Sequence, residues 1–426
     1  MSGQRWWRWG FVAVWMLAGA PRVAQASSEM ELLLNKLVEK GILTSTEATQ
    51  IRQEVAAEQN DQAASAKPAA KESASAASPN WQWNGDLMLR HEFRNRTGSG
   101  QNTTRQRVRL RVGFDAKVSE HLKAGARLAT GSASDPISTL QTFNTSFNRV
   151  TFLVDRAYLE YTPMLHGLTE TKITGGIIEN PFWTPSQLVW DEDLNFDGAA
   201  LHLAKHIGSV RLAANSGLFA LQSDMTETAA LWSVQGVASV QPFADATEEA
   251  LKQLKLTGSL AYHDYQNVTR GKSSATAMAT AGGTKGNNAT LRDVNLINPA
   301  VQLATQIAGF PVTTYADYVH NTAAVAGQND GVQLGVSVGQ ATVPWDLKHG
   351  WQAGYFFERL EPDATFGAFT YSDFGGSGTN HRGHLWWMKL ATLKNSYLIL
   401  KYVNTRELKG AKNHFDTVQI DWLTKF

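Results

Sequence analysis

The chain has 426 residues, with 39 basic and 38 acidic side chains and no cysteine. The lack of cysteine excludes a disulfide scaffold, a thiolate metal site and a thiol nucleophile. The near balance of charge does not indicate nucleic-acid binding, and no spacing of side chains points to a metal or an organic cofactor.

Residues 1–26 have the pattern of a secretory signal peptide. Arg5 and Arg8 precede an apolar run from Trp9 to Ala20, and Ala24-Gln-Ala26 supplies small residues at the cleavage position. The run is well short of the ~20 residues that a membrane-spanning helix needs. We therefore expect export and cleavage after Ala26.

Residues 27–59 are expected to form a short helix, a turn and a second helix in the periplasm. Gly41 breaks the apolar pattern, and Thr44 or Ser45 is placed to cap the second helix. The apolar positions recur at helical spacing: Leu32, Leu33, Leu37, Leu43, Ile51 and Val55. This segment either packs on itself as a hairpin or forms a coiled coil that helps to assemble a homotrimer.

Residues 60–80 are rich in Ala, Ser, Lys and Pro and lack large apolar side chains. Such a composition cannot bury enough apolar surface to offset the entropy of ordering. We interpret this segment as a flexible linker to the region that follows.

Residues 81–426 alternate polar and apolar side chains with a period of two, as strands do. About fifteen such segments can be counted, and a further one is expected between Thr276 and Ala308. No segment after the N-terminal run is apolar enough to cross a bilayer as a helix, so a membrane location requires a closed sheet. The sequence predicts an all-β fold, a transmembrane antiparallel barrel of sixteen strands.

One predicted strand carries arginine at every second position, at Arg105, Arg107, Arg109 and Arg111. These side chains share a face that cannot meet lipid, so we expect them to line an aqueous interior. Neighbouring strands add further members of this arginine wall: Arg90, Arg94, Arg127 and Arg156. The wall either presents an electropositive surface that favours anions or is neutralised by acids such as Glu92 and Asp115.

Two acidic segments between strands are candidates for a loop that narrows the interior. The first is Gly131–Arg149, which contains Asp135. The second is Asn180–Gly198, and its acidic residues are Asp191, Glu192, Asp193 and Asp197. A loop of this kind opposite the arginines would create a transverse field, whereas a solvated surface loop is the alternative.

The last strand ends on an aromatic residue, Phe426, and its apolar face continues back through Trp422, Ile420 and Val418. An outer-membrane barrel needs such a strand, because its last strand must pair with the first. The pattern is similar to the signal read by the outer-membrane assembly machinery. Aromatic residues near strand ends are expected to form girdles in contact with outer-membrane lipid: Trp81, Trp83, Phe152, Tyr161, Trp232, Tyr262, Tyr355, Trp386, Trp387 and Trp422.

Several short motifs, taken in order along the chain, resemble the putative porin family of Gram-negative bacteria. They include Arg127-Leu-Ala-Thr-Gly131, Asp135-Pro-Ile-Ser-Thr139, Asp155-Arg-Ala-Tyr-Leu159, Glu179-Asn-Pro-Phe182, Val189-Trp-Asp-Glu-Asp-Leu194, Pro311-Val-Thr-Thr-Tyr-Ala-Asp-Tyr318 and Ser372-Asp-Phe-Gly-Gly-Ser-Gly-Thr379. Lys40-Gly-Ile-Leu-Thr44 is similar to the family's leading segment. Where the family has a lysine after two glycines, this chain has Ile177. The resemblance implies a sixteen-stranded outer-membrane pore.

The sequence therefore favours an outer-membrane porin through which small hydrophilic solutes diffuse passively. One alternative is a structural anchor whose helical segment contacts peptidoglycan. A second is a barrel hydrolase, which is disfavoured because no histidine has a serine two positions further on.

Overall fold

A computed structural model describes Thr46, Thr49 and residues 80–97, 102–143, 149–223, 228–268, 293–324 and 326–426. The expected signal peptide, helical hairpin and linker lie almost wholly outside the described residues. The fold below is that of the unit that runs from Ala77 to Phe426.

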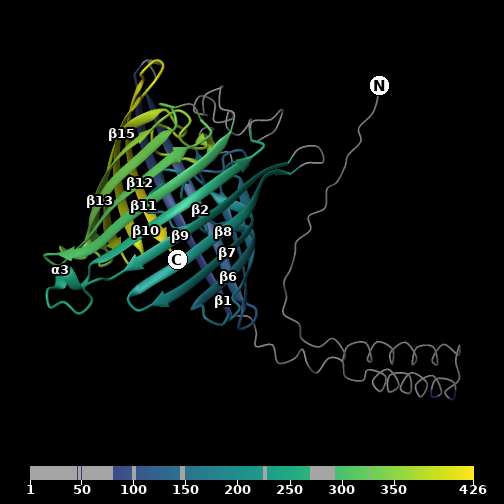
Figure 1. The fold of residues 1–426 in the computed structure, drawn as a ribbon. Helices are drawn as coiled ribbons and strands as arrows, with labels where there is room; N and C mark the ends of the chain where they lie inside the picture. Colours follow the sequence, from purple (N-terminus) through teal and green to yellow (C-terminus); the bar gives the residue numbers. More distant parts are fainter. Residues whose placement is uncertain are drawn as a thin grey trace, which may run out of the picture. The chain divides into compact units, whose positions relative to one another are not determined.

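Seventeen strands make up the sheet in the described part of the chain (Figure 1). They are β1 (Asn80–Arg96), β2 (Thr103–Lys117), β3 (Leu122–Thr130), β4 (Gln141–Thr142), β5 (Phe152–Tyr161), β6 (Glu170–Glu179), β7 (Asn195–Ile207), β8 (Val210–Ser223), β9 (Thr228–Val240), β10 (Lys255–Gln266), β11 (Val294–Ile307), β12 (Phe310–Asn321), β13 (Asp330–Ala341), β14 (Gly350–Leu360), β15 (His381–Leu393), β16 (Ser396–Glu407) and β17 (His414–Lys425). Two short helical segments accompany them, α3 (Glu249–Lys252) and the 3-10 helix η1 (Gly367–Phe369). Within the described ranges, no helix is long and apolar enough to cross a membrane.

β4 has only two residues and pairs with β2 beyond the end of β3, so sixteen strands form the barrel itself. The predicted all-β barrel of sixteen antiparallel strands is confirmed. The strand that was expected between Thr276 and Ala308 is β11. β4 was not predicted, because two residues are too few to show an alternation.

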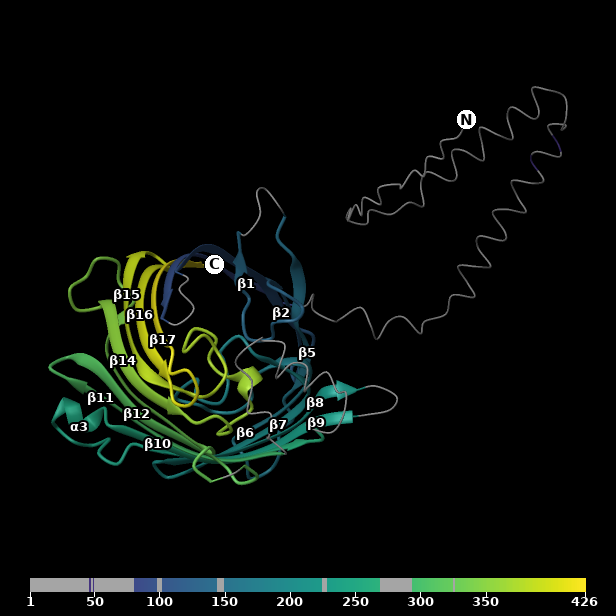
Figure 2. The same ribbon diagram turned by 90° about the horizontal axis from the view of Figure 1, so that it is seen from above.

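The barrel closes where β17 pairs with β1, in a register that runs from Asp86 opposite Lys425 to Arg96 opposite Phe415. Figure 2 shows the resulting ring of strands from above. Past the last residue of β17, Gly85 and Phe426 exchange backbone hydrogen bonds of 2.8 and 3.1 Å. The ring of Phe426 lies against Gly85, where a β-carbon would come within 2.6 Å of it. Closure gives the first and the last strand a partner on both sides, as a membrane requires.

Each strand presents one face to the interior and one to the outside. On β1 the side chains of Met88 and Arg90 are buried inside, whereas Leu87 and Leu89 are exposed outside. β17 continues the same division. The outer face is apolar because lipid cannot satisfy charged groups, so the polar side chains of these strands gather in the interior.

The two ends of the barrel differ. Short connections, such as those at 208–209 and 394–395, lie at the end that holds Asn80 and Phe426, which we call the turn end. Longer connections join the strands at the opposite end, the loop end. The turn-end connection between β9 and β10 contains the four-residue α3, and the loop-end connection between β14 and β15 contains η1.

Three loop-end segments fold into the ring, and we call them the plug: residues 131–143, 180–194 and 361–380. Figure 2 shows the yellow-green chain between β14 and β15 inside the ring of strands. The plug contributes Ile137, Phe182, Trp190 and Phe366 to an apolar core that also includes Leu231 of β9 and other inward residues of β6–β12 and β14. The plug therefore packs on one side of the interior, since burying these side chains supplies the attraction.

Leu110 and Val112 alternate with the inward arginines of β2 and so belong to its outer face. Changing both to arginine is expected to prevent insertion, because each guanidinium on a lipid-facing position costs about 2–4 kcal/mol near the bilayer centre. The folded fraction can be measured by the heat-dependent shift in electrophoretic mobility after refolding into phospholipid vesicles. Leu110→Ile with Val112→Ile is the control, and equal folded fractions would show that this face does not meet lipid.

Candidate functional site

A cavity of about 960 Å³ lies inside the barrel beside the plug. On its other side are the inner faces of β1–β3, β5 and β15–β17, which we call the charged wall. The basic and acidic residues that line the cavity are Arg90, Arg109, Arg111, Arg127, Arg156, Lys389, Lys401, Lys425, Glu179, Asp191, Glu192, Asp193, Asp373 and Asp421. Of the predicted arginine wall, Arg94, Arg105 and Arg107 do not line this cavity.

Arg90 joins the charged wall to the plug. Its guanidinium contacts Asp421 of β17 at 2.7 Å and Asp373 of the plug at 2.8 Å. All three side chains are nearly inaccessible to solvent. A buried ion pair of this kind is retained only with good geometry, because both charges have lost their hydration.

Glu92 neutralises two of the predicted arginines. Arg94 contacts its carboxylate at 2.8 Å, and Arg105 forms a second, short contact with the same oxygen. Gln419 of β17 donates to the other oxygen at 3.0 Å. Glu92 is fully buried, so these partners replace the water that the carboxylate has lost.

Arg109 and Arg111 share two acids. Asp86 of β1 accepts from Arg109 at 2.9 Å and from Arg111 at 2.7 Å. Asp193 of the plug lies 3.0 Å from Arg111 and 3.9 Å from Arg109. The acidic segment thus binds the arginines directly instead of facing them across an open interior.

Arg127 pairs with Asp155 through a short contact, and Arg156 contacts Glu179 at 2.9 Å. Arg107 differs from the other seven arginines. Its guanidinium donates to the Ser138 hydroxyl at 3.2 Å and to the Leu140 carbonyl at 3.0 Å, and no carboxylate lies within 4.0 Å of it among the described residues. Acidic side chains therefore neutralise most of the arginine wall. This is one of the two interpretations that the sequence left open.

Asp193 and Asp191 hold the plug together. The Asp193 carboxylate accepts from the backbone and hydroxyl of Thr139 at 3.1 and 2.9 Å. Burial alone would raise its pKa, but Arg109 and Arg111 hold the pKa of Asp193 below its ordinary value. Asp191 forms no ion pair with any arginine that the structure describes; it accepts from the backbone N–H groups of Asp193 at 2.8 Å and Ser372 at 2.7 Å. Burial and the nearby charge of Asp193 raise its pKa well above the ordinary value.

The other three acidic candidates do not join this network. Glu192 is exposed and lines the cavity. Asp135 is exposed, and the nearest bond to its carboxylate is from the backbone N–H of Ile137 at 3.4 Å. Asp197 was expected in the second loop, but it lies in β7 on the outer face, since its neighbour Phe196 packs in the interior. The loop ends at Leu194, three residues before Asp197, which is why the side chain points away from the cavity.

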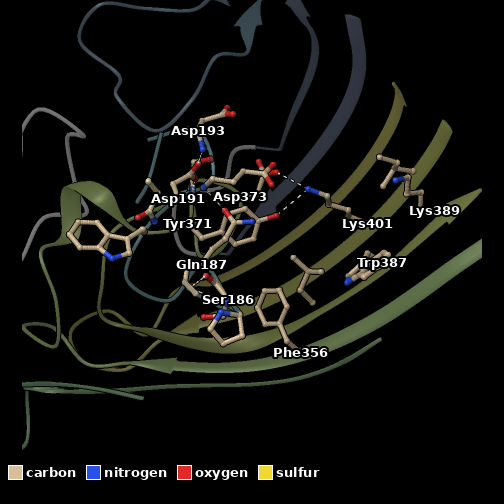
Figure 3. A pocket seen from close by; sticks show the side chains of 18 of the residues that line it. Ser186, Gln187, Asp191, Asp193, Phe356, Tyr371, Asp373, Trp387, Lys389 and Lys401 are labelled. Atoms are coloured by element: carbon tan, nitrogen blue, oxygen red, sulfur yellow. Dashed lines mark hydrogen bonds and ion pairs between the residues drawn. The ribbon is translucent and has the colours of Figure 1, made fainter. Parts of the chain in front are cut away.

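The sequence analysis missed the central acid of the site, Asp373. It accepts from Arg90 at 2.8 Å and from Gln419 at 3.0 Å. It also accepts from Lys401 at 3.2 Å, a contact that Figure 3 shows. Burial opposes ionisation, yet Arg90 and Lys401 hold the pKa of Asp373 well below the ordinary value. Asp373 stands in a glycine-rich stretch that resembles a surface turn, so nothing local signals its burial.

Trp387 was expected in the outer aromatic girdle, and this was wrong. It lines the cavity, whereas Trp386 beside it is exposed on the outer face. The indole lies over Gly354 of β14, where a β-carbon would come within 2.6 Å of the ring. Lys389, two residues further along β15, also lines the cavity, and both are seen on the inner wall in Figure 3.

A serine and a histidine do meet across strands, which the spacing test for a hydrolase could not detect. Ser233 of β9 and His263 of β10 are directly opposed, with 2.8 Å between the hydroxyl and Nδ1. Both are 1% exposed, and the rings of Phe182 and Trp190 cover the imidazole. No substrate reaches such a pair, so it is part of the packing.

Solved structures with a similar fold include porins of the outer membrane. OprB of Pseudomonas putida is 10% identical, with a TM-score of 0.53 over 81% of this chain and 94% of that one. The DcaP channel of Acinetobacter baumannii is 12% identical, with a TM-score of 0.47 over 83% and 99% of the two chains. OmpF of Salmonella typhi is also 12% identical, with a TM-score of 0.48 over 82% and 98%. At these identities the OprB match supports the fold.

No curated protein matches the sequence. The profile of the putative porin family, however, matches residues 90–296 and 293–426, which together are most of the chain. The motifs that resemble this family lie within those residues, except for Lys40-Gly-Ile-Leu-Thr44. The chain therefore belongs to the putative porin family and is an outer-membrane channel for small solutes.

Proposed function

We propose that the channel conducts small hydrophilic solutes by passive diffusion, with a modest preference for anions. The cavity is the observation that carries this proposal. Eight basic and six acidic side chains line it. Asp86 and Asp155 oppose the arginines from outside the lining, so the preference is smaller than an exposed arginine column would produce.

We also propose that the turn end faces the periplasm and the loop end the outside. Short periplasmic turns and longer external loops are the rule for bacterial barrels. Both Asn80 and Phe426 lie at the turn end, which supports a periplasmic location for the helical segment that the sequence predicts before Asn80. The outward aromatic face of β17, with Trp422 and Phe426 exposed at its end, supports recognition by the assembly machinery.

A structural anchor that contacts peptidoglycan through the N-terminal segment is the second candidate. The cavity favours a channel. A passive anchor has no need of an open space inside the barrel that is lined by charged side chains. Planar-bilayer recordings of the purified full-length protein are expected to show stepwise conductance. A folded, heat-modifiable protein that gives no steps would favour the anchor.

The position of Asp193 generates a prediction on ion selectivity. Asp193→Asn is expected to shift the reversal potential in asymmetric potassium chloride toward greater anion preference, because it uncovers part of the charge of Arg109 and Arg111. Asparagine still accepts from Thr139, so the plug contact is kept. Asp197→Asn is the matched control, since this acid lies on the outer face. Equal shifts in the two variants would contradict the proposed role of Asp193.

We propose that residues 27–59 assemble the protein into a homotrimer. Removal of these residues is expected to convert trimers into monomers on native gels while the barrel remains folded, because the barrel unit has its own closed sheet. Heat-modifiability of the truncated protein is the control for folding. A truncated protein that stays fully trimeric would show that contacts between barrels are sufficient.

A further inference from the structure

Two lysines in the turn half of the interior differ from the other cations of the cavity. Lys389 of β15 and Lys425 of β17 both line it. Among the residues that the structure describes, neither ammonium has a carboxylate within 4.0 Å, whereas Lys401 contacts Asp373 at 3.2 Å. Asp86, the cross-strand neighbour of Lys425, is already bound by Arg109 and Arg111. These two ammonium groups are therefore free to bind a solute.

Lys389 and Lys425 lie on the same inner wall, on the two strands that flank β16. The ammonium of Lys389 lies 4.0 Å from the centre of the Tyr397 ring on β16, a cation–π contact that fixes the side chain. The backbone N–H of Lys425 donates to the Asn395 carbonyl at 2.8 Å and anchors the end of β17. The charge of Lys425 acts on Lys389, so an anion beside both would relieve their repulsion.

An apolar surface adjoins the two lysines on the same inner faces. Trp387 and Lys389 are two residues apart on β15, and Leu423 and Lys425 are two residues apart on β17, so each pair shares a face. Ile399 lies on β16, between these strands. Other apolar side chains of the cavity wall extend this surface on β14 and β15: Phe356 and Leu385. A solute held by the lysines would place its body against this surface.

We propose that Lys389 and Lys425 form a binding site for small organic carboxylates with an apolar body. The carboxylate accepts hydrogen bonds from the two ammonium groups, and the apolar body lies against Trp387 and Leu423. Charge alone would draw any anion, whereas the adjoining apolar surface favours one that also buries hydrocarbon. This inference rests on the proposed channel function. It assigns the selectivity of the channel to Lys389 and Lys425 instead of to the arginine wall.

Benzoate block of chloride current through the full-length protein in planar bilayers tests the site. In the Lys389→Gln/Lys425→Gln variant, the benzoate concentration for half-block is expected to rise about tenfold, as the loss of a charge-assisted hydrogen bond predicts. Chloride current should fall but stay measurable, because six of the eight basic side chains that line the cavity are kept. Acetate, which lacks the apolar body, is expected to block the wild-type channel more weakly than benzoate.

A variant with the same change in charge provides the control. Lys123 and Lys172 also face the interior in the turn half, but they share Glu160 at 3.3 and 3.6 Å in a separate cavity. Lys123→Gln/Lys172→Gln should leave the benzoate block within about twofold of wild type, well below the tenfold effect of a lost charged hydrogen bond.

Equal loss of benzoate block in both double variants would overturn the site and assign the effect to net charge. An unchanged block in the Lys389→Gln/Lys425→Gln variant would also overturn it. A wild-type protein without stepwise conductance would instead contradict the proposed channel, so the two failures are distinguishable.

Discussion

Backbone hydrogen bonding in hydrocarbon is the constraint on which this structure depends. A strand that meets lipid cannot leave N–H or C=O groups unpaired, so β17 must return to β1 and the sheet must close. Closure gives every strand an outer face that only apolar residues tolerate. The charged residues of the strands are thereby directed inward, where little water is available to solvate them. Their pairing with acids, and the folding of the plug against them, both follow from that confinement.

Period two was sufficient to predict the strands, the closed sheet and the face on which the arginines lie, because it reports directly on the two environments of each strand. This alternation was insufficient wherever the position of a strand boundary decides which face of the sheet a side chain lies on. Asp197 seemed to belong to a loop, but β7 begins at Asn195 and turns its side chain outward. Trp386 and Trp387 are adjacent, so one must point inward, and only the register of β15 shows which one. The plug has no period at all, and some of its partners are hundreds of residues away, as with Asp373 and its contact to Arg90.

Arginine and lysine have different tasks in this interior. Arg90 uses its planar fork to bind Asp421 with two nitrogens and Asp373 with a third, which ties wall to plug in a fixed geometry. Arg90 therefore stiffens the barrel, and the two carboxylates beside it largely neutralise its charge. Lys389 and Lys425 carry compact charges on flexible stems and have no acid beside them in the described structure. The arginines are the most numerous of these residues and the easiest to notice in the sequence. They nevertheless contribute the least to the net electric field in the interior.

The apolar core of the plug also bears on how the protein reaches its native state. It joins Ile137, Trp190 and Phe366, whose positions span more than half the barrel's length in sequence. Bringing such distant positions together carries a large entropic cost of loop closure, as the pairing of β1 with β17 also does. The inner faces of many strands form the surface against which these side chains are buried. The packing of the plug therefore depends on the closed sheet, and a change that opened the ring would also remove the surface that holds the plug.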